Sequence, residues 1–64
     1  MTKQEYTKIA ENIMQIRALG KNSPTQDGQN QAESACDCIA YAIAYDVLKD
    51  EKREDFMRLC NLRK

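Results

Sequence analysis

Apolar side chains recur at helical spacing over the first part of the chain. Four of them follow one another at intervals of three, four and three residues, which places them on one side of an α-helix. These are Tyr6, Ile9, Ile13 and Ile16. Thr2 and Glu5 have the residue types and spacing of a capping box at the start of this helix. Gly20 is the expected C′ residue in a left-handed conformation, so we predict a helix over about 3–19.

A polar stretch without periodic apolar residues comes next, and it contains the only proline and the second glycine. Ser23 and Pro24 have the residue types of a helix N-terminus, with the serine as N-cap. The Asp-Gly pair at 27–28 offers a competing start, or a turn. The pattern predicts a linker of about 20–28 and leaves the start of the second helix open within 23–29.

The central segment is rich in alanine, which favours a helix over a strand, and we place this helix at about 29–49. At 100° per residue it is apolar on two sides. One broad face holds Ala32, Cys36, Ile39, Ala40, Ile43 and Val47. The other holds Cys38, Tyr41, Tyr45 and Leu48. Asp37 and Asp46 mark the seams between them. The first helix can cover one face, so the second needs a further covering.

The last segment opens with seven charged residues and then carries an apolar stripe of Phe56, Leu59 and Cys60. Asp50 has the residue type of an N-cap, which predicts a third helix over about 51–62. The alternative is that the second helix continues through 49–55; we favour a break at about 49–51. The basic residues here alternate with acids, as on a solvated face.

Together these elements predict an all-α fold in a single domain, 1–64. It consists of a helical hairpin plus a short C-terminal helix, three helices in all. We expect homodimerisation to complete this fold, with C2 symmetry as the default geometry.

Composition narrows the function classes. The formal net charge is zero, and no segment has the basic excess of a phosphate-backbone binder, so nucleic acid is not the favoured partner. The chain has no histidine, and Cys36 and Cys38 would point about 200° apart on a helix, so we expect no catalytic residue, no metal site and no cofactor. Three cysteines without a secretory signal predict reduced thiols and a cytoplasmic location. No apolar run approaches the length of a membrane span.

The run from Ala35 to Leu48, the charged break after it, and Phe56 followed by Cys60 resemble a class of short phage-encoded helical proteins. In that class an alanine-rich helix leads to a short C-terminal helix with a phenylalanine and then a cysteine. The resemblance covers the C-terminal half of the chain and implies no functional residues. It implies a context, because small accessory phage proteins often block host proteins, including those of defence systems.

The sequence therefore predicts a non-enzymatic protein-binding module, an inhibitor or adaptor acting on a host protein in the cytoplasm. Tyrosine is enriched at protein interfaces because its ring is apolar and its hydroxyl polar, so we place the contact on the second face of the central helix. The predicted partner-binding residues are Tyr41, Tyr45, Leu48, Cys38 and Asp37. Two alternatives stay open: a dimeric nucleic-acid-binding regulator, and an oligomer that sequesters a small ligand.

Overall fold

The computed structural model describes residues 1–62, which contain helices and no strand. The elements are α1 (Lys3–Gly20), α2 (Gln26–Ala42), a π-helical turn η1 (Ile43–Val47) and α3 (Asp50–Leu59). This confirms the predicted all-α fold of three helices. The break between the second and third helices is also confirmed, at Leu48 and Lys49.

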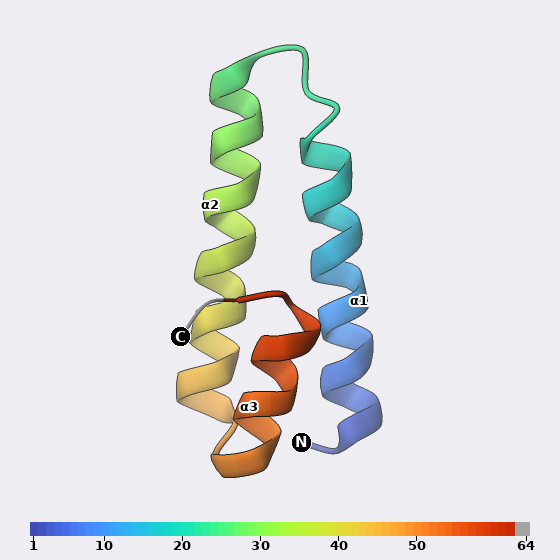
Figure 1. The fold of residues 1–64 in the computed structure, drawn as a ribbon, viewed down its shortest axis with the longest axis vertical. Coiled ribbons are helices and arrows are strands. Elements are labelled where there is room, and N and C mark those ends of the chain that lie inside the picture. Colours follow the sequence, from blue (N-terminus) through green and yellow to red (C-terminus); the bar gives the residue numbers. More distant parts are fainter. Residues whose placement is uncertain (63–64) are drawn as a thin grey trace.

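The three helices form a hairpin with a short third helix against one end (Figure 1). α1 and α2 run antiparallel and are joined by a short loop at one end. α3 packs beside the halves of α1 and α2 that lie far from this loop. The extents along the principal axes are 38, 20 and 15 Å. The loop half of the hairpin therefore consists of two helices only.

Hydrogen bonds to side chains fix where the first two helices begin. The predicted capping box of α1 is present: Glu5 N donates to Thr2 Oγ1 at 3.3 Å, and Thr2 N donates to a Glu5 carboxylate oxygen at 2.8 Å. The N-cap of α2 is Thr25, whose hydroxyl accepts from Gly28 N at 3.0 Å. The second helix thus starts at Gln26, inside the predicted window of 23–29 but before 29. Neither of the two starts left open, Ser23 as N-cap or the Asp-Gly pair at 27–28, is the one that the chain adopts.

Gly20 does not have the predicted left-handed conformation. It is the last residue of α1, and Lys21 follows as a C-cap with right-handed helical angles. The reason for glycine here is a close approach between helices, since a Cβ at this position would lie 2.3 Å from Ala32 Cβ. The missing side chain lets the loop ends of α1 and α2 come together.

The core lies where all three helices meet. Ten of residues 1–62 are buried: Tyr6, Ala10, Ile13, Cys36, Ala40, Ala44, Leu48, Phe56, Met57 and Cys60. The Tyr6 and Phe56 rings meet edge to face at 6.2 Å, a favoured aromatic geometry. The Tyr6 hydroxyl donates to Asp55 Oδ2 at 2.5 Å. This hydrogen bond raises the pKa of Tyr6 and, with the Arg58 guanidinium, lowers the pKa of Asp55.

α3 ends at Leu59, earlier than the predicted 62, because Asn61 takes a left-handed conformation (φ 57°). Leu62 N donates to Met57 O at 2.8 Å and Asn61 N to Arg58 O at 3.0 Å. These two bonds define a Schellman motif, in which a left-handed residue satisfies the last helical carbonyls. Asparagine tolerates this conformation better than most residues.

At its other end, α3 begins without the predicted cap. Lys49 occupies the N-cap position and makes no side-chain capping bond. Asp50 is the first residue of α3 and has a positive φ of 55°. The prediction of Asp50 as N-cap is therefore wrong. Its left-handed angles reverse the chain direction between η1 and α3.

Candidate protein-binding surfaces

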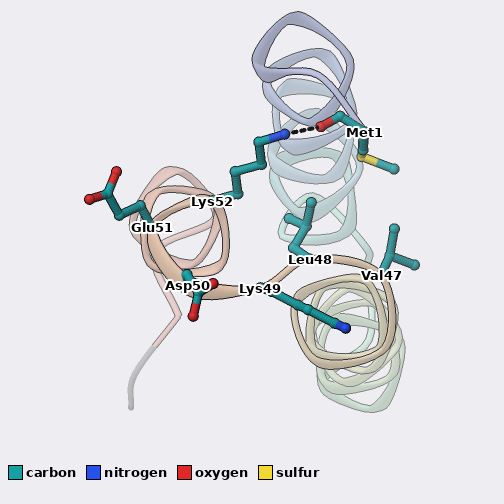
Figure 2. A pocket seen from close by; sticks show the side chains of 7 residues that line it. All are labelled: Met1, Val47, Leu48, Lys49, Asp50, Glu51 and Lys52. Carbon is teal, nitrogen blue, oxygen red and sulfur yellow. Dashed lines mark hydrogen bonds between the residues drawn. The ribbon is translucent and has the colours of Figure 1, made fainter.

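The π-helical turn decides which side chains of the central helix reach the core. Leu48 N donates to Ile43 O at 3.0 Å, a bond across five residues that winds the chain less per residue than an α-helix does. Leu48 then has extended angles and turns inward, and 2% of its side chain is exposed. Figure 2 shows Leu48 directed between η1 and α1, and Val47 directed away from α3.

This geometry corrects two sequence-based placements. Leu48 was predicted to share the face of Tyr45 and to bind a partner, but it is a core residue of its own chain. Val47 was predicted to face the first helix, but it is 52% exposed. Both errors have one cause, since a constant 100° per residue does not hold through a π-helical turn.

Arg53 secures the end of this turn, a role that its place in a mixed charged segment does not reveal. Arg53 Nε donates to Ala44 O at 2.8 Å, and Nη2 donates to Leu48 O at 3.2 Å. Where the helix ends, these two carbonyls have no backbone N–H donor from the next turn, so the Arg53 guanidinium donates to them instead. The prediction of a uniformly solvated charged face is wrong at this position, where the side chain is half-buried.

The same guanidinium lies over an exposed aromatic ring. The Arg53 Cζ atom is 4.7 Å from the centroid of the Tyr45 ring, within the range of a cation–π contact. The Tyr41 ring stacks on Tyr45 at 6.2 Å with an interplanar angle of 16°. Tyr45 is nevertheless 52% exposed, and Cys38 is exposed one turn before Tyr41. We call Cys38, Tyr41, Tyr45 and Arg53 the tyrosine surface.

Asp37, the fifth predicted partner-binding residue, is paired within the chain. Arg17 Nη2 donates to Asp37 Oδ1 at 2.5 Å, and the arginine side chain is largely buried while the carboxylate is partly exposed. This ion pair joins α1 to α2 on the side of the hairpin that also holds the C-terminal segment. The structure therefore gives Asp37 a contact within the hairpin that the sequence did not predict.

A second apolar surface lies on the hairpin itself. Its exposed members are Ile16, Leu19, Ile39 and Val47, and its partly buried members are Ile9 and Ile43. We call these six residues the hairpin face. The sequence placed Ile39 on the side covered by the first helix, but about half of its side chain is exposed. α1 covers the small residues of that side, Ala40 and Cys36, and leaves the larger ones outside.

The three thiols differ in environment. Cys36 and Cys60 are buried, as small apolar residues often are, and Cys38 is exposed. Burial raises the pKa of the Cys60 thiol to about 11, so its reactive thiolate form is suppressed. Within residues 1–62 no three histidine, cysteine or acidic side chains gather in a way that could hold a metal ion.

An open hollow lies at the base of the bundle, where the N-terminus meets the start of α3 (Figure 2). Lys52 Nζ donates to Met1 O across it at 2.8 Å. The side chains of Lys49, Asp50 and Glu51 point in different directions and do not converge on one point.

In the part of the chain that the structure describes, none of the helices combines the length and apolar character needed to cross a bilayer. Comparison with known proteins finds no matching family model, no matching curated protein and no matching solved structure. The two exposed surfaces of this chain are its candidate binding sites.

Proposed function

We propose that this protein is a non-enzymatic binding protein that contacts a partner protein through the tyrosine surface. The observation that carries the proposal is the exposed Tyr45 ring, which contacts both the Tyr41 ring and the Arg53 guanidinium. Tyrosine and arginine are the residue types that most often dominate the binding energy of protein interfaces.

The surface is ordered before any partner arrives, which favours binding. Arg53 is fixed by its bonds to Ala44 O and Leu48 O, and the Tyr45 ring contacts the Tyr41 ring and the Arg53 guanidinium. Immobilising a flexible side chain on binding costs about 0.5–1.5 kcal/mol, and a side chain that is already fixed avoids most of that cost. The ring can therefore contribute most of its contact energy to affinity.

The resemblance to short phage-encoded proteins supplies the proposed context. In that context the partner is a bacterial host protein, such as a component of a defence system, and the chain acts in the host cytoplasm as an inhibitor or adaptor. An inhibitor of this kind needs no catalytic group, which fits a chain without histidine.

The nucleic-acid alternative has less support. Several basic side chains of α3 are engaged within the chain: Lys52 with Met1 O, Arg53 with the end of η1, and Arg58 with Asp55. Arg63 and Lys64, the last two basic residues of the predicted charged face, lie outside the described residues. In the ligand-sequestering alternative an oligomer would hold a small ligand between its subunits, and the polar side chains at the open hollow at the base diverge and give that alternative no support.

The test compares capture of bacterial host proteins by the tagged wild-type chain, Tyr45→Ala and Lys8→Ala. Lys8 is exposed on α1, a different helix from the one that carries Tyr45, and serves as the control. We expect one host protein to be retained by the wild type and the control and lost with Tyr45→Ala. Truncation of a central interface tyrosine costs about 2 kcal/mol or more, roughly a 30-fold loss of affinity, which titration calorimetry with the purified partner would measure.

Identical capture by all three chains would refute the tyrosine surface as the site. A salt-dependent gel shift with DNA or RNA, without any captured protein, would instead favour the nucleic-acid alternative.

A further inference from the structure

We propose that the hairpin face is the interface of a homodimer, so that its occupant is a second copy of this chain. The face is distinct from the tyrosine surface, and the proposal does not depend on the partner-binding function. Four observations support it: the side on which the face lies, the absence of a core in the loop half of the hairpin, the size of that side, and the lack of charge in the middle of the face.

The hairpin face lies on the side of the hairpin opposite α3. On α1, Met14 and Leu59 of α3 line the same hollow, so Met14 marks the side of α1 that faces α3. Ile16 is two residues further along α1, which turns it about 200° away from that side. On α2, Tyr41 and Leu62 of the C-terminal segment line the same hollow. Ile39 is two residues before Tyr41, so it too lies about 200° away from that side. Figure 2 shows Val47 directed to this same side. The chain's own third helix therefore cannot cover these residues.

The loop half of the hairpin also lacks a core. None of the residues from Met14 to Ala35 is buried, and all ten buried residues lie before or after that stretch. Leu19, in this half, is 71% exposed. Two helices cannot enclose a hydrophobic core by themselves, and a chain of this size buries only about 60% of its unfolded surface. A further layer of helices on the hairpin face would enclose these side chains.

The broad side of the hairpin, on which the hairpin face lies, is large enough for a stable dimer interface. The two longer extents of the molecule, 38 and 20 Å, are those of the hairpin, so its broad side has a footprint of about 38 × 20 = 760 Å². A stable protein interface buries about 800 Å² on each partner. A contact that uses most of this side would therefore be large enough.

The chemistry of the face suits a copy of itself. The middle of the face carries no charge: its smaller residues there are Asn12 on α1, and Ala32 and Ala35 on α2. Exposed acids stand toward its base, at Glu5 and Asp46. The uncharged middle can meet its own copy without charge repulsion, and small residues let helices approach closely. Under C2 symmetry the same patch meets itself. Two antiparallel hairpins joined in this way form a four-helix bundle, with each α3 on the outside.

In such a dimer the tyrosine surface stays accessible. Tyr45 contacts Arg53 of α3, and α3 lies on the outer side of each subunit. The assembly would present two copies of the tyrosine surface, one on each subunit. Two copies allow a dimeric partner to be bound with avidity.

The test measures the mass of the full chain in solution by sedimentation equilibrium, from low micromolar to submillimolar concentration. Three chains are compared: the wild type, Ile39→Glu, and Ser34→Glu as a control that adds the same charge to an exposed position of α2. We expect the wild type and Ser34→Glu to reach twice the 7.4 kDa mass of one chain, and Ile39→Glu to remain at 7.4 kDa. Circular dichroism establishes that each variant is helical.

Should Ile39→Glu fail to fold, Leu19→Glu replaces it, because a side chain that is mostly exposed in the monomer is not needed for folding. A wild-type chain that stays at 7.4 kDa over the whole range overturns the proposal. So does a dimer that survives both glutamate variants on the hairpin face, or one that Ser34→Glu also disrupts.

Discussion

Replacing Leu48 with alanine tests the inward turn of the chain after η1. The side chain is 2% exposed and lies among the core residues, so its loss leaves a cavity. Truncation of a buried leucine to alanine costs about 2–5 kcal/mol. A domain of 64 residues has a total stability of only about 3–10 kcal/mol, so this single change would remove a large part of it.

The matched control is Val47→Ala at the neighbouring position. Val47 is 52% exposed, and substitutions at such positions usually change stability by about 0.5 kcal/mol or less. A regular α-helix would reverse the two positions, with Val47 in the core and Leu48 outside. The ratio of the two costs therefore distinguishes the π-helical turn from an uninterrupted helix.

The assay is urea unfolding followed by circular dichroism at low micromolar protein concentration, where association contributes least. With a urea dependence of about 1 kcal/mol per molar, Leu48→Ala should lower the midpoint by about 2 M or more, and Val47→Ala by about 0.5 M or less. If Leu48→Ala is unfolded in water, Leu48→Val provides a smaller deletion of about 1 kcal/mol. Equal costs at the two positions, or a larger cost at Val47, would refute the inward placement of Leu48.

Three further predictions follow from named contacts. Gly20→Ala should destabilise the protein in thermal unfolding, because overpacking against Ala32 costs about 1–3 kcal/mol and outweighs the gain of about 1 kcal/mol in helix propensity; a stabilised variant would contradict the close approach. Tyr6→Phe should destabilise the fold most near neutral pH. The lowered pKa of Asp55 means that its hydrogen bond stabilises the fold above the ordinary aspartate pKa, and this contribution is lost as pH falls through the folded-state value. The raised pKa of Tyr6 means that its own contribution is lost as pH rises through its folded-state value, so a difference between variant and wild type that is constant across pH would argue against the bond. The Cys60 thiol should resist alkylation in the native state and react fully in denaturant, as mass mapping of the labelled peptides would show; rapid native labelling would contradict its burial.

The sequence alone determined the features that depend on neighbouring residues. The capping box of Thr2 and Glu5 was predictable because both partners stand within one helical turn. The helical class of all three segments followed from apolar spacing and alanine content. The break before α3 was predicted at the right place, although its premise, Asp50 as the N-cap, was wrong. The excess of apolar surface on the hairpin was also predictable in kind, since one helix cannot cover two sides of another.

Tertiary structure decided where that apolar surface lies. The π-helical turn places Leu48 in the core and Val47 outside it. The spacing of residues along the chain does not predict where such a turn forms. Arg53 stabilises the broken helix end from a different element, through contacts that exist only after α3 folds back. Residue spacing along one helix predicts which side chains share a side. Which side is covered depends on where the other helices pack, and that depends on contacts between residues far apart in the chain.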